Sequence, residues 1–268
     1  MKKWIAEELA EKKGRVTLVR VLLRFWLPFK KYPNNGVWSY ILQVEDGVVV
    51  FDVGAEKGVR IKKTKNVTKV MEVVEEYFPG QKIREILLSH YHYDHAGGAP
   101  LLQKMAKEKW GYKPLIRIHK NDCQIKKIWK VKKSSLVKLF EKSGVKDWEM
   151  GRWLRDGERI RNSDWTIKHT PGHTSGTISL VNGKEKIVIG GWLNEEIENR
   201  LIGWLQGKFI DEDKSNYCNT RKVVNRLKCL GYQRYYLHPM IKKGRINPPS
   251  SKLFVEKYRD LSRRYGRR

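Results

Sequence analysis

The sequence predicts an α/β fold, and three observations lead to that prediction. Two runs rich in Val, Ile, Leu and aromatic residues, 15–27 and 38–52, have the length and composition of strands. Apolar residues recur at helical spacing over 67–78. A second series of strand-like runs then occupies 165–189. Strands and helices therefore come first, and further strands follow them.

The opening segments predict a group of paired strands. Residues 1–14 are charged and helix-prone. The first strand, 15–27, leads into a stretch rich in Pro, Asn and Gly at 28–36, which predicts a loop. The run over 38–52 contains Glu-Asp-Gly at 45–47, a tight-turn signal, so it predicts a hairpin.

Helices and short strands alternate through the middle of the chain. The helix over 67–78 is expected to stop at a Pro-Gly pair, and a short strand over 83–88 follows it. A Gly-Gly-Ala-Pro turn precedes a helix over 101–109 and a strand over 115–119. Asn121 or Asp122 could cap a further helix that reaches Phe140, with outward lysines as a candidate anion-binding surface.

The last third of the chain returns to strands. They are expected at 165–169, 177–181 and 186–189. Asn182-Gly183 is a strong hairpin-turn signal. A basic C-terminal helix is predicted over 251–265. Because the chain contains neither a linker-like stretch nor a repeat, one domain over 1–268 is expected.

Composition limits the classes of protein to consider. The three cysteines are scattered, which argues against a disulfide framework and against a zinc knuckle. The sequence shows no secretory signal and no run of about 18 apolar residues that could form a transmembrane segment. A cytoplasmic protein is therefore expected.

The formal net charge of +27 is extreme and is spread along the chain. Two interpretations stay open. A basic surface attracts a polyanion such as nucleic acid. Abundant Lys, Arg and Glu is also the composition of thermophile proteins, in which charge networks add stability at high temperature.

The strongest functional signal is the segment Ser89-His90-Tyr91-His92-Tyr93-Asp94-His95, directly after the strand predicted at 83–88. It holds three imidazoles and a carboxylate, which are ligands that zinc-type ions take in proteins. Alternate residues His90 and His92 can face one side while Asp94 and His95 reach an adjacent position. Alone, the segment could equally be a polar surface loop.

Two further histidines favour a metal site over a surface loop. His173 lies in the turn Thr-Pro-Gly-His-Thr-Ser-Gly at 170–176, and His238 follows another strand-like run. The chain therefore resembles the metallo-β-lactamase superfamily, whose pattern is H-x-H-x-D-H, a later P-G-H-T turn and a last histidine. The resemblance covers about 40–239 and includes the apolar strand that ends in Asp52-Val53-Gly54.

The resemblance implies a four-layer αβ/βα sandwich and a hydrolase with one or two zinc-type ions, with iron or manganese as alternatives. His90, His92 and His173 would hold the first metal. Asp94, His95 and His238 would hold the second. Asp52 would lie near the metals without binding them, and His119 and His169 would be ordinary residues.

One departure from the family pattern concerns the second metal. Gly191 stands where many relatives carry a bridging aspartate. This loss implies either a weakened second site, as in a mononuclear or inactive protein, or a hydroxide-bridged pair of metals like that of the third β-lactamase subclass. We favour the two-metal site because all six other ligands are present.

Metal-assisted hydrolysis is the implied reaction, with Asp94 orienting the attacking water. The local resemblance is to the branch that cleaves small-molecule esters, thioesters, lactones and amides. A phosphodiesterase or nuclease acting on nucleic acid would explain the charge better. A third alternative is a nucleic-acid-binding protein on an inactive hydrolase scaffold.

Overall fold

The structure is a computed structural model, and it describes most of the first 190 residues and parts of the rest. The described residues are 6–12, 14–24, 36–56, 65–123, 140–141, 143–171, 173–190, 226–227, 229–237, 241–242 and 245–246. The chain divides into two compact units, Met1–His238 and Pro239–Arg268. The fold and the candidate site belong to the first unit. The expectation of one domain over 1–268 stays a prediction.

A six-stranded sheet is formed by the first half of the chain, in the order β1-β2-β3-β4-β5-β6. Its strands are β1 (Ala6–Lys12), β2 (Arg15–Arg24), β3 (Gly36–Val44), β4 (Gly47–Phe51), β5 (Ile83–Leu87) and β6 (Leu115–Arg117). The first four pair antiparallel, whereas β4, β5 and β6 run parallel. Parallel strands end on the same edge of a sheet, which is where α/β proteins place their chemistry.

The hairpin predicted around Glu-Asp-Gly is confirmed between β3 and β4. Gly47 pairs with Val44 and has a φ of 155°. A Cβ at this position would lie 2.4 Å from the backbone oxygen of Lys82, so the close passage of the neighbouring chain requires glycine.

The helical preference of the first residues is overridden, because residues 6–12 form the strand β1. β1 pairs with β2, and the half-buried Glu7 accepts two hydrogen bonds from the Arg20 guanidinium. Pairing of this kind depends on a partner strand that local sequence preference does not include, so tertiary contacts decide the conformation.

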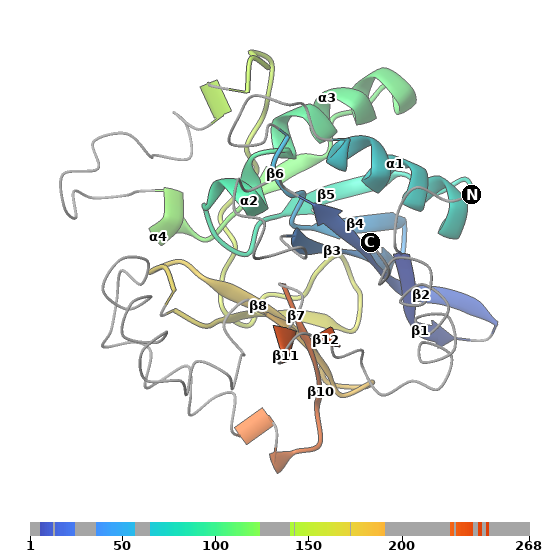
Figure 1. The fold of residues 1–268 in the computed structure, drawn as a ribbon, viewed down its shortest axis with the longest axis vertical. Helices are drawn as coiled ribbons and strands as arrows, with labels where there is room; N and C mark the ends of the chain where they lie inside the picture. The colour runs from blue at the N-terminus through green and yellow to red at the C-terminus, as the bar shows by residue number, and fades with distance from the viewer. Residues whose placement is uncertain are drawn as a thin grey trace. The chain divides into compact units, whose positions relative to one another are not determined.

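Two helices cover one face of this sheet: α1 (Asn66–Tyr77) and α3 (Ala99–Trp110) (Figure 1). Both helices are confirmed. α3 begins two residues earlier than predicted, because Pro100 fits the first turn of a helix, where its missing N–H costs nothing. It ends at Gly111 in the left-handed conformation.

The second sheet has four strands in the order β10-β9-β8-β7. They are β7 (Trp165–His169), β8 (Ile178–Asn182), β9 (Ile187–Gly190) and β10 (Gln233–Tyr236). The predicted β8–β9 hairpin is confirmed, but its connection is longer than a two-residue turn. The Asn182 side chain accepts hydrogen bonds from the N–H groups of Lys184 and Glu185, which holds this longer connection.

The two sheets pack face to face, and their facing side chains belong to one hydrophobic cluster. Alternate residues of β9 show the layering. Ile187 and Ile189 lie in that cluster, whereas the buried Val188 packs against Leu227 of a helical turn on the other face of the sheet. The chain is therefore a four-layer αβ/βα sandwich.

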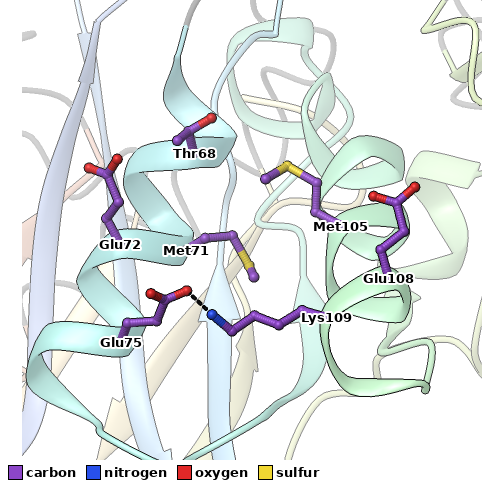
Figure 2. A pocket seen from close by; sticks show the side chains of 7 residues that line it. All are labelled: Thr68, Met71, Glu72, Glu75, Met105, Glu108 and Lys109. Atoms are coloured by element: carbon purple, nitrogen blue, oxygen red, sulfur yellow. Dashed lines mark hydrogen bonds and ion pairs between the residues drawn. The ribbon is translucent and has the colours of Figure 1, made fainter.

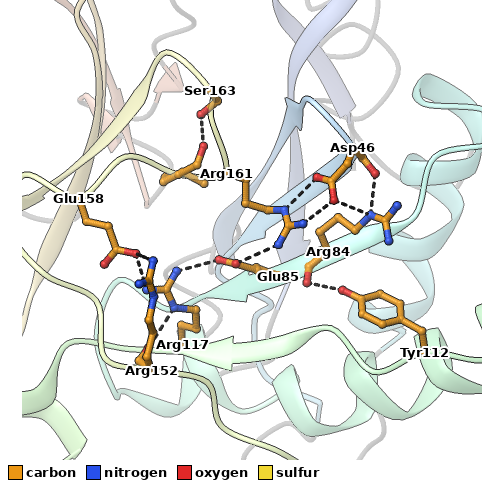
Figure 3. Close-up of polar contacts among 10 residues, drawn as sticks. Asp46, Arg84, Glu85, Tyr112, Arg117, Arg152, Glu158, Arg161 and Ser163 are labelled. Atoms are coloured by element: carbon orange, nitrogen blue, oxygen red, sulfur yellow. Dashed lines mark hydrogen bonds and ion pairs between the residues drawn. The ribbon is translucent and has the colours of Figure 1, made fainter.

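A network of ion pairs links β5 and β6 of the first sheet with the segment that precedes β7 in the second (Figure 3). Arg117 of β6 bonds Glu85 of β5 at 2.9 Å and Glu158 at 2.6 Å. Arg161 also bonds Glu85, and it pairs with Asp46 in the β3–β4 turn. Arg117 is almost fully buried, so part of this ion-pair network lies in the interior of the protein.

Several predictions fall partly or wholly outside the described residues. The helix predicted between Asn121 and Phe140 lies mostly outside the described residues, which include the short α4 (Lys120–Cys123). The basic helix over 251–265 lies outside them. The second unit contributes the described strands β11 (Ile241–Lys242) and β12 (Arg245–Ile246), which pair antiparallel. Among the described residues, no helix has the length and apolar character needed to cross a bilayer.

Candidate metal centre

The histidine segment begins where β5 ends. Leu88 still donates a hydrogen bond to Arg117 of the next strand, and the chain then leaves the sheet. His92 is extended and precedes the one-turn helix α2 (Tyr93–Ala96), whose His95 and Ala96 donate to the His92 carbonyl. The segment is therefore a loop that closes in a helical turn, which carries Asp94 and His95 to a position beside His90.

Three imidazoles converge at this edge: those of His90, His92 and His173. The structure brings one ligand atom of each within 4.8 Å of the others. Nε2 of His90 lies 3.1 Å from Nε2 of His173. His90 and His173 are almost fully buried, and His92 is partly exposed. Two of these histidines lie in one segment and the third comes from the loop between β7 and β8.

This donor set fits a zinc-type cation. Zinc binds imidazole nitrogen at about 2.0–2.1 Å, and two ligands of a tetrahedral site are then about 3.3 Å apart. The separation of 3.1 Å between the two Nε2 atoms matches that spacing. The Nδ1 atom of His90 faces the Ser89 hydroxyl at 2.8 Å, so Nε2 is the nitrogen turned toward the other histidines.

Asp94 and His95 lie beside this trio. The ring centroids of His95 and His90 are 4.2 Å apart, and Nε2 of His95 lies 3.6 Å from an Asp94 carboxylate oxygen. Burial lowers the pKa of His95, but Asp94 and Asp52 together outweigh it, so the pKa is raised. The same negative surroundings that favour a protonated imidazole also favour a bound cation.

Asp52 supports the histidines from behind, at the end of β4. Its carboxylate accepts hydrogen bonds from the Ser89 N–H at 2.8 Å and the Ser89 hydroxyl at 2.7 Å, and it lies 2.8 Å from Nδ1 of His95. It is fully buried and has a φ of 62°, an unusual conformation for a residue other than glycine. Asp52 thus fixes the ring of His95 directly and that of His90 through Ser89.

The remaining predicted ligand, His238, lies outside the described residues, as does Gly191. Their neighbours are described. β9 ends at Gly190 and β10 at Tyr236, and the two strands pair in parallel, residue 236 beside residue 190. Leu237 is buried, and its carbonyl accepts a hydrogen bond from Trp38 of the first sheet at 2.6 Å. The predicted placement of His238 at a strand end therefore stays a prediction.

Sequence analysis offered Asp122 only as one of two possible caps for a helix that lies mostly outside the described residues, and it did not foresee the contacts of Asp122 with the histidine segments. Asp122 lies inside α4, and its buried carboxylate accepts hydrogen bonds from Tyr91, Thr174 and Gly176. A signal was available, because Asp122 follows the strand predicted at 115–119 just as the histidine segment follows β5.

His119 and His169, expected to be ordinary residues, stack on each other with ring centroids 4.1 Å apart. Nε2 of His169 lies 3.0 Å from the Ser175 carbonyl oxygen. Burial, His169 and Lys120 lower the pKa of His119 to about 4, so its imidazole is neutral at pH 7. The pair packs beside the His173 loop, and neither member belongs to the histidine cluster.

A separate hollow of about 430 Å³ lies between α1 and α3 (Figure 2). Met71 and Met105 face each other across it, and Glu75 pairs with Lys109 at one side. None of the residues that line it is a predicted metal ligand. The histidine cluster is therefore the candidate functional site.

Comparison with known proteins identifies the family of this chain. The family model described as the metallo-beta-lactamase superfamily matches residues 32–215. An uncharacterized protein of Aquifex aeolicus (strain VF5) is 28% identical over 145 residues, which is 53% of this chain. The chain spans 62% of that relative's length.

Solved structures resemble the fold at low identity. The protein VMB-1, in a crystal structure at pH 5.5, gives a TM-score of 0.58 at 16% identity and covers 91% of this chain and 93% of its own. An N-acyl homoserine lactone hydrolase, with the product N-hexanoyl-L-homoserine bound at the catalytic metal centre, gives 0.52 at 16% identity, covering 76% and 81%. At such identity these likenesses show the fold.

Proposed function

Because this chain belongs to the metallo-beta-lactamase superfamily of metal-dependent hydrolases, we propose that it cleaves an ester, thioester, lactone or amide of a small molecule. The observation that carries the proposal is the convergence of His90, His92 and His173 within 4.8 Å. These three histidines hold the first metal in this proposal. Asp94, His95 and His238 hold the second.

The metal, when bound, supplies Lewis-acid chemistry, which polarises the scissile group and lowers the pKa of water from about 15.7 to about 7. The chain's own residues position the reactants. The partly exposed carboxylate of Asp94 lies beside His95. In this proposal the carboxylate accepts a hydrogen bond from the attacking water and orients that water. Asp52 and Ser89 keep the rings of His95 and His90 in place.

The number of metals follows from the ligand set. Gly191 stands where many relatives carry a bridging aspartate, so this chain has no bridging carboxylate there. The other six proposed ligands are present, three for each ion. We therefore propose two zinc ions, with iron or manganese as substitutes of similar ligand preference. The proposed substrate class is supported by the lactone hydrolase that shares the fold, whose product binds at its metal centre.

The test begins with metal content measured by plasma mass spectrometry on protein purified without chelator or histidine tag. Close to two equivalents are expected, followed by turnover in a panel of lactones, thioesters, esters and β-lactams. His92→Ala and His173→Ala should each lose metal and turnover while the circular dichroism spectrum is kept. His119→Gln is the matched control, because it removes a histidine outside the ligand set, and it should keep both. Full turnover in the two ligand variants would overturn the proposal.

A further inference from the structure

Asp122 lies between the two segments that carry the histidine cluster. It follows β6 in the short helix α4 and is 1% exposed. A buried carboxylate is costly unless its oxygens are hydrogen-bonded. The Asp122 carboxylate accepts hydrogen bonds from the His90–His95 segment and from the His173 loop.

The hydrogen bonds of Asp122 connect those two segments directly. One oxygen, Oδ2, accepts from the Tyr91 N–H at 3.2 Å and from the Thr174 hydroxyl at 2.7 Å. The other, Oδ1, accepts from the Gly176 N–H at 2.6 Å. Tyr91 stands between His90 and His92, and Thr174 is next to His173. A single carboxylate therefore bonds to the neighbours of all three clustered histidines.

The packing around Asp122 is equally close. A Cβ at Gly176 would lie 2.4 Å from Oδ1 of Asp122 and 2.5 Å from its Cγ, so the loop can approach the carboxylate only because residue 176 is glycine. Asn121 adds a hydrogen bond from its side-chain amide to the Ser175 carbonyl at 3.2 Å. α4 thus contacts the His173 loop over consecutive residues.

A second link joins the same segments farther back. The Ile178 N–H, at the start of β8, donates to the Ser89 carbonyl at 2.9 Å. This backbone hydrogen bond and the hydrogen bonds of Asp122 hold the two segments together at two points.

We propose that Asp122 is a positioning residue that sets the separation of His173 from His90 and His92, and through it the affinity for the metal. This inference rests on the proposed function of the histidine cluster. Outer partners that orient metal ligands typically contribute about 10–100-fold in affinity. We expect a loss of that size when the carboxylate is removed.

The experiment measures the zinc dissociation constant by competition with a chromophoric chelator, together with the thermal midpoint of the metal-free protein. Asp122→Ala should weaken zinc binding about 10–100-fold. Asp122→Asn should lose less, because the amide keeps one accepting oxygen. Glu158→Gln is the matched control, a largely buried carboxylate that bonds Arg117 and Arg152 away from the histidines. It should lower the midpoint and leave the zinc affinity unchanged.

A glycine pair tests the same link from the other side. Gly176→Ala should displace Asp122 and weaken zinc binding, whereas Gly183→Ala, where the nearest atom to a new Cβ is 3.6 Å away, should not. Wild-type zinc affinity in folded Asp122→Ala or Gly176→Ala would overturn the positioning role. If Asp122→Ala does not fold, the zinc dissociation constant of Asp122→Asn decides instead, and a wild-type value would overturn the positioning role. A wild-type protein that binds no zinc would instead refute the proposed function itself.

Discussion

Asp52 combines an unusual backbone conformation with three polar contacts to the segment that holds the histidines. A positive φ costs about 1–2 kcal/mol for most residues, and Asp and Asn tolerate it best. The residue thus supports the candidate site through both its backbone and its carboxylate.

Replacing Asp52 by Ala should lower the free energy of unfolding of the metal-free protein by about 1–3 kcal/mol, because Ser89 and His95 lose a buried partner. Zinc affinity should fall about 10–100-fold as the His95 ring loses its orientation. Urea unfolding and chelator competition measure the two effects. Asp52→Asn keeps an accepting oxygen, and asparagine tolerates a positive φ. Its stability and zinc affinity should therefore lie between those of the wild type and of Asp52→Ala. An unchanged Asp52→Ala in both measurements contradicts this role.

At the residue scale, sequence reasoning reaches furthest where the candidate metal-binding residues are neighbours in the chain. His90, His92 and Asp94 stand in one short segment, so their chemistry is legible before any fold is known. The role of Asp122 was missed because Tyr91, Thr174 and Gly176, which donate hydrogen bonds to it, lie 31 to 54 positions away. Its position after the strand predicted at 115–119 is a sequence signal, but that position does not identify the partners of the carboxylate.

Among the elements, β6 carries a buried cation that pairs with two carboxylates. The Arg117 side chain is 4% exposed, and both of its carboxylate partners, Glu85 and Glu158, are largely buried. Removing one member of a buried ion pair leaves an uncompensated charge and destabilises by about 3–5 kcal/mol.

Arg117→Met should therefore lower the free energy of unfolding by about 3 kcal/mol, since Glu85 and Glu158 lose their buried cation. Arg152→Ala is the control. Arg152 bonds the same Glu158 oxygen at 2.9 Å, but its side chain is 76% exposed, and exposed pairs contribute about 0–1 kcal/mol. Urea midpoints of the two variants compare them directly. If both variants lose the same free energy of unfolding, burial does not decide how much each ion pair of this network stabilises the fold.

Most elements were predicted where hydrophobic periodicity sets the outcome, as in α1, α3, β7 and β8. β1 was not, because the sequence Ala-Glu-Glu-Leu-Ala-Glu-Lys favours a helix when taken alone. Its conformation depends on pairing with β2, a contact that helix propensity does not register.

On the scale of the whole molecule, the net charge of +27 is the feature that hydrolysis of a small molecule leaves unexplained. It favours a second candidate function, association with nucleic acid through a basic surface. Lys and Arg contacts to phosphate release counterions, so such binding weakens steeply as salt rises.

Fluorescence anisotropy with labelled RNA and DNA should show binding at 50 mM salt that weakens about 10³-fold or more by 200 mM, if six or more phosphates are contacted. His92→Ala should bind equally well, because the histidine cluster takes no part in this association. Failure to bind either polymer at physiological salt would remove the polyanion partner and leave thermophile composition as the account of the charge.

The hydrogen bond from Trp38 to Leu237 joins the first sheet to the last described strand segment of the first unit. β10 completes its sheet by pairing with β9, which precedes it by more than forty positions. During synthesis, the first sheet can form while the later strands are still being made, since chains fold as they emerge. The proposed ligand His238 comes one residue after Leu237. In the proposed ligand set, a newly made chain therefore lacks one ligand of the second metal until residue 238 has been synthesised.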